Sequence, residues 1–296
     1  MQEQIDRFLR YLQDEKGYSG NTIAAYRNDL QQFLTFLDPI VADEMASWAD
    51  VDGERIKMYG AYLEDRSYAP STVARKIASV KSFFSYLLDS GVLVDNPTDA
   101  LDAPKVEKKL PRILTVEEVE SLLAEPSKGT TPKALRDRAL LELLYATGMR
   151  VSEVITLEYG DLDLQAKRVV CTGRDGKARE LPLTARALEA QLAYLEKGRD
   201  ALLRGRTEKM LFVNQRGRPL TRQGLWLIIK SYAEAAGLGP DITPHTLRHS
   251  CAAHHLAQGA DLKQVRELLG HANIATTQAY MNVVSSLAEE TDVVPA

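Results

Sequence analysis

Apolar residues in the first hundred positions recur at the spacing of amphipathic helices. Apolar side chains stand at i, i+3, i+4 and i+7 in residues 5–12, and similar stripes follow in residues 26–37, 56–63 and 73–87. Asp38-Pro39 predicts the end of the second helix, because a residue that precedes proline disfavours helical backbone. We therefore expect a small all-helical unit over residues 1–95.

Residues 96–112 show no such period. They contain three prolines and alternate charged residues between Lys105 and Lys109, a composition typical of an interdomain linker. Thr115 followed by Glu118 has the sequence of a capping box, which predicts that a new helix begins there. We expect a second domain over residues 113–296.

The second domain mixes helical and strand patterns. Residues 134–146 are strongly apolar and end at Gly148, which predicts a buried helix with a C-terminal glycine. Residues 168–172 alternate in the manner of a strand, and Asp175-Gly176 has the sequence of a two-residue hairpin turn. A second short hairpin is predicted around residues 211–217, and helical patterns resume afterwards. The whole chain is therefore expected to be mainly α with a small β-sheet.

Composition is that of an ordinary globular protein. The chain has 296 residues, 45% of them hydrophobic and 26% charged, which suits one large domain or two smaller ones. No apolar run approaches the ~18 residues of a membrane span, and the polar, acidic start lacks the pattern of a signal peptide. Two cysteines, Cys171 and Cys251, are too few for a disulfide framework and fit a reducing cytosol. We expect a cytoplasmic protein.

Charge is unevenly distributed although the net charge is only −4. Basic side chains gather in residues 66–88 and 204–230, while acidic side chains collect elsewhere. By charge alone, solvated helix faces and turns explain both basic stretches. Charge therefore permits a nucleic-acid partner without establishing one.

Three short clusters in the second domain carry candidate chemistry. Arg150 follows a glycine break with Glu153 placed to brace it, His245 and Arg248 stand three residues apart, and His271 follows another helix-ending glycine. Two guanidiniums and two imidazoles can converge on one anion, and arginine forks match phosphate oxygens without losing their charge. Because no Asp/Glu cluster accompanies them, the set indicates phosphoryl chemistry without magnesium.

Tyr280 is the natural nucleophile for such a set. A tyrosyl oxygen that attacks a phosphodiester forms a covalent ester and conserves the bond energy, so rejoining needs no ATP. Its ordinary pKa near ~10 leaves little phenolate at pH 7, so the reaction requires a base or a strong positive field.

Other interpretations of these residues are weaker or less specific. His245 and His249 are four residues apart, as in some zinc sites, but the residues between them lack the glutamate of the metalloprotease pattern, so no metal site is expected. His254 and His255 stand among Ala and Leu and resemble packing or surface residues. Tyr280 by itself is equally compatible with a buried aromatic.

The joint order of the motifs resembles the tyrosine recombinase (phage integrase) family: an arginine, then His-x-x-Arg, then Gly-His, then a tyrosine. The resemblance extends over residues 1–290 and is closest to the Xer subgroup, including the run Ser19-Gly20-Asn21-Thr22-Ile23-Ala24-Ala25-Tyr26. It implies an N-terminal helical, SAM-like core-binding domain and a mixed α/β catalytic domain, which clamp the duplex like a C. It also implies that no cofactor is needed.

The resemblance assigns roles to the candidates. Arg150 and Arg248 would hold the scissile phosphate, His245 and His271 would assist proton transfer and transition-state binding, and Tyr280 would form a 3′-phosphotyrosyl link that frees a 5′-hydroxyl. A 5′-hydroxyl from a partner duplex then attacks, and two rounds of exchange pass through a Holliday junction. The basic stretches would contact DNA phosphates through Arg75, Lys76, Lys81, Arg216, Arg218 and Arg222.

The family's assembly is a tetramer on two double-stranded DNA sites, formed with itself or with another recombinase. The Xer subgroup further implies chromosome dimer resolution at cell division, regulation by a DNA translocase, and docking of residues 283–290 on a neighbouring protomer. The runner-up is an integrase of a phage or mobile element, although the helical unit leaves no room for an extra arm-binding domain before it. A type IB topoisomerase, a non-catalytic DNA-binding protein and a histidine-metal hydrolase are further alternatives.

One motif departs from the family. The family places a catalytic lysine in a hairpin run of the type Gly-Lys-Gly-x-Lys-x-Arg, and here Arg174 occupies that position. Arginine is a poor general acid because its pKa exceeds ~12. If Asp175-Gly176 is a two-residue turn, Arg174 and Lys177 are directly opposed and share one face. Our hypothesis is that Lys177 donates the proton and Arg174 binds backbone phosphate.

Overall fold

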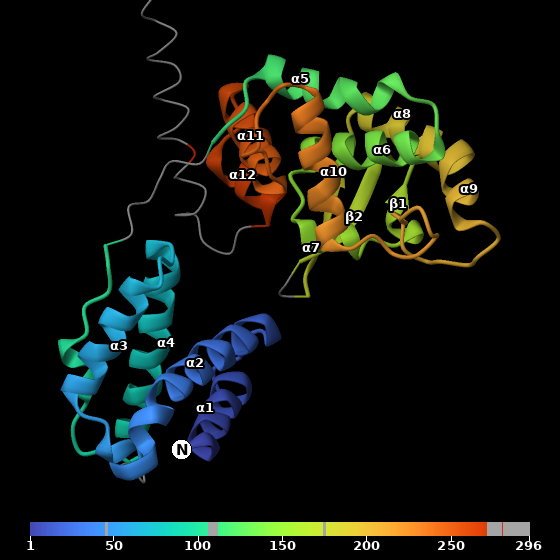
Figure 1. Ribbon diagram of the computed structural model, residues 1–296. Coiled ribbons are helices and arrows are strands. Elements are labelled where there is room, and N and C mark those ends of the chain that lie inside the picture. The colour runs from blue at the N-terminus through green and yellow to red at the C-terminus, as the bar shows by residue number, and fades with distance from the viewer. Residues whose placement is uncertain (45–46, 106–111, 174–175, 271–279, 281–296) are drawn as a thin grey trace, which may run out of the picture. The chain divides into compact units, whose positions relative to one another are not determined.

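The computed structural model describes residues 1–44, 47–105, 112–173, 176–270 and residue 280. The chain divides into two compact units, Met1–Lys109 and Leu110–Ala296, each with its own hydrophobic core (Figure 1). In these ranges no helix is long and apolar enough to cross a membrane.

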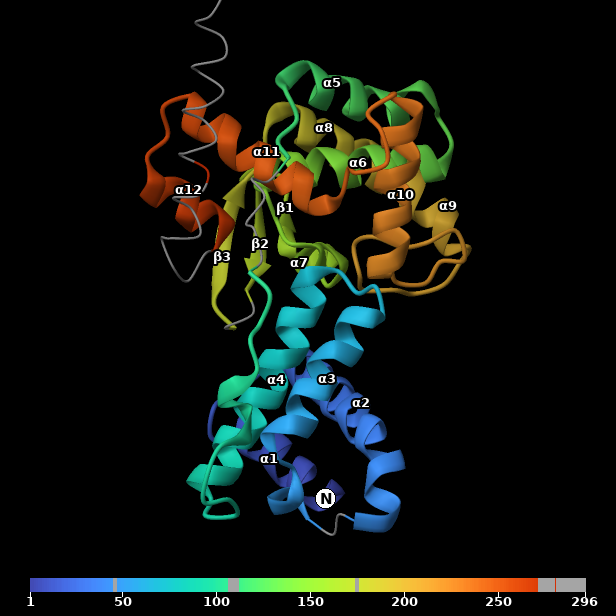
Figure 2. The ribbon, with the colours of Figure 1, turned by 60° about the vertical axis from the view of Figure 1, so that its left-hand side comes forward.

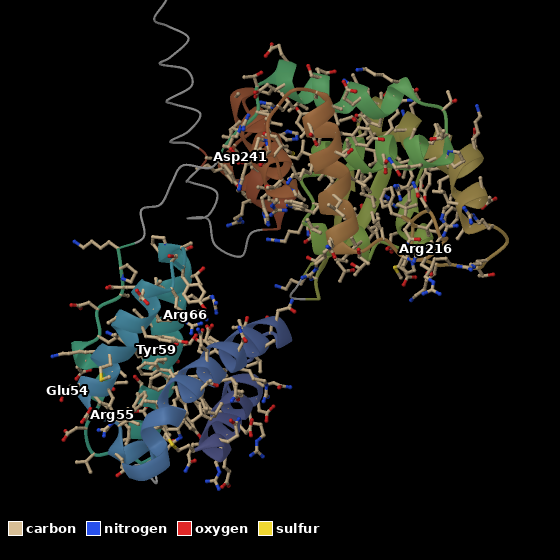
Figure 3. All side chains as sticks on the ribbon, viewed as in Figure 1. Glu54, Arg55, Tyr59, Arg66, Arg216 and Asp241 are labelled. Atoms are coloured by element: carbon tan, nitrogen blue, oxygen red, sulfur yellow. The ribbon has the colours of Figure 1, made fainter. Side chains whose placement is uncertain are left out.

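The first unit is helical. Its elements are α1 (Gln2–Asp14), α2 (Gly20–Glu44), η1 (Trp48–Asp50), α3 (Gly53–Asp65), α4 (Pro70–Asp89) and η2 (Pro97–Ala100). The predicted apolar stripes form its core, and Phe8, Leu30 and Phe84 are almost fully buried. Tyr59, which is labelled on α3 in Figure 3, meets the ring of Phe33 edge-on, with 4.7 Å between the ring centroids. The helical prediction for this part of the chain is therefore confirmed.

The predicted end of the second helix is wrong. Backbone helix continues through Pro39 to Glu44. A proline removes one N–H donor and biases the residue before it, but it does not force an end where packing favours the helix. Here Leu30, Phe33 and Leu37 are buried on the turns that precede the proline.

The expected linker begins with residues that belong to the first unit. The short helix η2 contacts α3 and α4, and Thr98 and Leu101 are buried. A Cβ at Gly60 would lie 3.1 Å from Leu101 Cδ1, which shows how closely this segment approaches α3. The spacing of apolar residues could not predict the packing of this segment against α3 and α4, because a short irregular segment has no regular hydrophobic period.

The second unit surrounds a central helix. Its elements are α5 (Val116–Ala124), η3 (Glu125–Lys128), α6 (Pro132–Thr147), α7 (Val151–Ile155), η4 (Tyr159–Asp161), β1 (Leu162–Asp163), β2 (Arg168–Thr172), β3 (Ala178–Pro182), α8 (Ala185–Ala193), η5 (Tyr194–Arg199), α9 (Asp200–Leu203), α10 (Arg222–Ala235), α11 (Pro244–Ala257) and α12 (Leu262–Leu269). The helix α6 packs against α8, η5 and α11, which explains why its apolar residues show no single stripe.

The three strands form an antiparallel sheet in the order β1-β2-β3. Figure 2 shows α12 beside β3, and the hydrogen bond from Arg179 Nε to Leu268 O, 3.0 Å, joins the two elements. The second predicted hairpin is present as a tight connection, with Asn214 N donating to Arg218 O at 2.8 Å and a bridge between Val213 and Pro219.

The hairpin between β2 and β3 has a three-residue loop, so the predicted two-residue turn is wrong. Thr172 pairs with Ala178, and Gly173 N donates to Lys177 O at 2.8 Å. Gly176 N donates to Gly173 O, and Gly176 has φ +76°, the pattern of a turn that ends in a left-handed residue. Lys177 therefore lies opposite Gly173 rather than opposite residue 174.

Candidate active site

Arg150 lies where α6 gives way to α7. Gly148 ends α6 in the left-handed conformation, with φ +57°, and a Cβ there would lie 2.6 Å from Leu269 Cδ2. Arg150 is the N-cap residue of α7, and Glu153 accepts both its backbone N–H (2.7 Å) and its Nη1 (2.9 Å). The predicted brace is therefore present, and the Arg150 side chain remains 22% exposed.

Arg248 lies on α11, one helical turn after His245. Thr243 caps this helix and Pro244 opens it. The guanidinium is 5% exposed; its Nη1 donates to Gly148 O and its Nη2 to Leu269 O at 2.7 Å. Arg150 Nη2 donates to the next carbonyl, Gly270 O, at 2.7 Å. The fold thus brings two of the candidate residues together at the C-terminal end of α12.

A third arginine completes this cluster. Arg179 of β3 forms a bidentate ion pair with Glu153, with both N–O distances 3.0 Å. Burial alone would raise the pKa of Glu153, but hydrogen bonds and charge from Arg179 and Arg150 lower it to about 2. Burial lowers the pKa of Arg248 to about 10, assisted by the charge of Arg150. Arginine side chains keep their charge in proteins, and one carboxylate stands among the three guanidiniums, so the cluster has an excess of positive charge.

Tyr280 lies beside this cluster. Tyr280 is 3% exposed and belongs to one buried cluster with Ala252, Val265 and Leu269. Its hydroxyl lies 2.7 Å from His249 Nδ1. Burial raises the pKa of Tyr280, while the charge of Arg248 opposes that rise. Tyr280 is therefore a neutral phenol near positive charge.

His249 is neutral. Burial, followed by the charges of His245 and Arg248, lowers its pKa to about 4. We infer that the Tyr280 hydroxyl donates to Nδ1 of this neutral imidazole, because a phenol is a better hydrogen-bond donor than an imidazole N–H. His245 lies on the same face of α11, with its ring centroid 6.3 Å from that of His249. The candidates His271 and Arg174 lie outside the described residues.

Known families match both units. The N-terminal SAM-like domain of phage integrases matches residues 5–91, and the phage integrase family matches residues 112–286. The chain belongs to the phage integrase family. The family assignment predicted from the order of the motifs is confirmed.

Known relatives match almost the whole length of this chain. Tyrosine recombinase XerC of Herpetosiphon aurantiacus is 48% identical, covering 99% of this chain and 94% of its own. Tyrosine recombinase XerD of Halalkalibacterium halodurans is 42% identical, covering 95% and 93%. A solved structure of XerH site-specific recombinase bound to difH substrate, in a pre-cleavage complex, has a TM-score of 0.75 at 23% identity over 94% of this chain and 92% of that one. The last similarity shows a shared fold.

Sequence motifs did not single out Arg179 or His249 for the site of this family member. The sequence offers His249 only as half of a possible metal-binding pair, and it offers Arg179 only as the last residue of the hairpin run. A signal for Arg179 does exist: it stands two residues after Lys177, so both face the same side of an extended strand. Among the described residues no three metal-binding side chains gather.

The predicted DNA-contacting cations of the family member differ in exposure. Arg216, Arg218 and Arg222 are exposed, and Figure 3 shows Arg216 on the loop that follows α9. Lys81 is half-buried, and Arg75 is half-exposed with its guanidinium on Asp29.

Lys76 differs from the expectation because its side chain is only 5% exposed. Its ammonium lies 3.2 Å from the fully buried carboxylate of Asp29. A buried ammonium that serves a buried carboxylate has no exposed donor for a phosphate. We therefore leave Lys76 out of the DNA interface.

Proposed function

We propose that this chain is a site-specific DNA recombinase that cuts and rejoins DNA through a 3′-phosphotyrosyl link to Tyr280. One observation carries the proposal: Tyr280 belongs to the same buried cluster as Leu269, whose carbonyl binds Arg248, and the charges of Arg248 and Arg150 both act on its hydroxyl and lower its pKa against the effect of burial. Its curated relatives bear the name tyrosine recombinase. The fold it shares with DNA-bound recombinases supports DNA as the partner.

In the proposed reaction, Arg150 and Arg248 bind the non-bridging oxygens of the scissile phosphate. The Tyr280 oxygen forms a bond to phosphorus as the bond from phosphorus to O5′ breaks. His245 and His271 assist the transfer of the phenolic proton and stabilise the transition state. The positive cluster favours phenolate formation and the charge that develops on the phosphorus oxygens. Attack by a second strand's 5′-hydroxyl reverses these steps and releases Tyr280.

The covalent step has a direct test. A nicked suicide substrate, from which the cleaved end diffuses away, should trap a protein–DNA adduct that resists denaturation. Tyr280→Phe should bind the same DNA and form no adduct, because only the attacking oxygen is missing. A wild-type protein that binds DNA but leaves no adduct would favour the non-catalytic alternative.

We propose that Lys177 donates the proton to O5′. Lys177 stands two residues before Arg179, the spacing of side chains on one face of an extended segment, and the Arg179 guanidinium lies in the cluster. An ammonium releases a proton far more readily than a guanidinium. Lys177→Ala should slow cleavage of ordinary DNA. It should leave cleavage of a 5′-bridging phosphorothiolate near the wild-type rate, since a thiolate leaves without an acid. A large defect on that substrate contradicts the assignment.

We further propose that the enzyme resolves chromosome dimers in the cytoplasm at cell division, as a tetramer on two DNA sites. Xer names among its relatives support this role over a mobile-element integrase. Such a tetramer contains this chain alone or together with a second recombinase, and a DNA translocase regulates it. Deletion of the gene should give cells whose chromosomes fail to separate, and the Tyr280→Phe protein should not correct them.

A further inference from the structure

Three consecutive carbonyls at the end of α12 each bind a different arginine. The last carbonyls of a helix lack partners within the helix and stand at the negative end of its dipole, so they attract cations. The pairs are Arg179 Nε with Leu268 O (3.0 Å), Arg248 Nη2 with Leu269 O (2.7 Å) and Arg150 Nη2 with Gly270 O (2.7 Å). The end of one helix thus organises the whole guanidinium cluster.

Arg179 is the arginine of this set with no role in the proposed reaction. Its Nη1 and Nη2 bind the two carboxylate oxygens of Glu153, while its Nε binds Leu268 O. The side chain is 15% exposed and that of Glu153 2%. One planar guanidinium therefore ties β3 to α7 and to the end of α12.

The carboxylate of Glu153 transmits this constraint to Arg150. Its Oε1 accepts from Nη1 of both arginines, at 2.9 Å for Arg150 and 3.0 Å for Arg179. Its Oε2 accepts Arg179 Nη2 and the backbone N–H of Arg150. A carboxylate held on one side by a rigid fork presents a fixed acceptor to the other arginine.

Gly270 shows how little space this arrangement leaves. It is left-handed, with φ +63°, and a Cβ there would lie 2.9 Å from Arg179 Nη1 and 3.0 Å from Arg179 Cζ. The guanidinium of Arg179 therefore lies directly against the residue whose carbonyl binds Arg150. Displacement of Arg179 would disturb both acceptors of Arg150, the carboxylate and the Gly270 carbonyl.

We propose that Arg179 is a positioning residue: it holds Glu153 and the end of α12 so that Arg150 presents its guanidinium to the scissile phosphate. The inference rests on the proposed recombinase function. Stability alone is a weak reason for a buried ion pair, because desolvation of the charges offsets much of their attraction. Orientation of Arg150 is a stronger reason for the ion pair between Arg179 and Glu153, since a misplacement of ~1 Å in such a site can slow the reaction ~10²-fold.

The test compares Arg179→Met with the wild type in single-turnover cleavage of the suicide substrate. Methionine keeps much of the length and removes the fork, so we expect cleavage to fall by roughly 10²-fold. Affinity for DNA should stay within about twofold, because the Arg179 guanidinium is engaged by Glu153 and by Leu268 O. Arg168→Met is the matched control. Arg168 lies on the neighbouring strand of the same hairpin in an exposed ion pair with Glu180, and its loss should leave cleavage unchanged.

A substrate with a neutral methylphosphonate at the scissile position separates positioning from general disturbance. If Arg179 acts through Arg150, the defect of Arg179→Met should shrink on this substrate, because a neutral phosphorus depends less on a guanidinium. An equal defect on both substrates, or wild-type cleavage of both, overturns the proposal. If the wild type itself forms no adduct, the recombinase function fails instead.

Arg179→Lys keeps the test decisive if the methionine variant does not fold. Lysine retains the charge beside Glu153 but cannot bridge two carboxylate oxygens and a carbonyl with one planar group. We expect a folded protein with cleavage that is slowed on the phosphate substrate and less affected on the methylphosphonate. Full wild-type activity of Arg179→Lys on the phosphate substrate overturns the need for the fork.

Discussion

The hydrogen bond between Tyr280 and His249 shows what burial does to single side chains in this site. Burial raises the pKa of the phenol and lowers that of the imidazole to about 4. The two groups are therefore both neutral at neutral pH, and a hydrogen bond of 2.7 Å joins the phenol oxygen to Nδ1. Their contact holds the Tyr280 oxygen in place without ionising it.

The acceptor at Nδ1 can be tested by substitution. Asparagine places its amide oxygen near the Nδ1 position, so His249→Asn should keep most of the cleavage activity. His249→Leu removes the acceptor and should slow cleavage by roughly tenfold, the effect of about one hydrogen bond. His249→Gln, whose amide lies near Nε2 instead, is the matched control and should resemble the leucine variant. Equal rates for Asn and Leu would contradict a role for Nδ1.

The pKa of His249 also predicts how this contact depends on pH. Because folding lowers the pKa from 6.5 to about 4, the neutral form persists in the folded protein down to that value. Protonation, and with it loss of the acceptor, is expected only as the pH falls through about 4. We therefore expect no change in rate from the titration of His249 above about pH 5. In this range the pH–rate profiles of the wild type and of His249→Asn should have the same shape.

Elements of the second unit meet at the site through glycines that end helices. Gly148 ends α6 and Gly270 ends α12, both with left-handed backbone. Each end approaches another element more closely than a side chain would allow. Without these two ends, the carbonyls that bind Arg150 and Arg248 could not come together.

Gly148→Ala should destabilise the fold by more than its backbone conformation alone requires. Left-handed backbone costs an alanine about 1–2 kcal/mol, and the added Cβ would also lie 2.6 Å from Leu269 Cδ2. Gly237→Ala is the control, since Gly237 has φ +72° and nothing within 4 Å of a Cβ. Urea unfolding should show a clearly larger loss of unfolding free energy for Gly148→Ala than for Gly237→Ala. Equal losses would mean that the Leu269 side chain moves aside without destabilising the fold.

The described cations of the molecule include both exposed side chains and side chains that serve buried carboxylates. Arg216, Arg218 and Arg222 are exposed, whereas Lys76 serves the buried Asp29. Net charge conceals this division, because the chain is acidic overall. DNA affinity should therefore depend on a few placed cations rather than on the net charge.

Arg222→Ala should weaken DNA binding and reduce the slope of log affinity against log salt by about 1, as the loss of one phosphate contact does. Lys76→Ala should leave that slope unchanged. It should instead lower the free energy of unfolding by about 2 kcal/mol, because Asp29 loses a charged hydrogen-bond donor. Arg7→Ala, which breaks an exposed ion pair on α1, should change neither quantity. A reduced salt slope for Lys76→Ala would return that residue to the interface.

Local patterns in the sequence were sufficient to predict a helical first unit, a small sheet in the second unit and membership of the family. Apolar spacing reports which face of a helix is buried, and the motifs from Arg150 to Tyr280 keep their order whatever the details of packing. These features depend on residues within a turn or two of one another. They could therefore be predicted without any knowledge of distant contacts.

Tertiary structure alone decided the features that join distant segments. Arg150 binds Gly270, 120 positions away, and Arg179 binds Glu153, 26 positions away; no local period encodes such pairs. The hairpin register depended on one extra loop residue, and a shift of one residue changes which side chains face each other. The basic stretch predicts that Lys76 is a surface cation, but in the structure Lys76 is buried beside the carboxylate of Asp29. A buried charge needs a partner, and only the folded chain determines which residue supplies it.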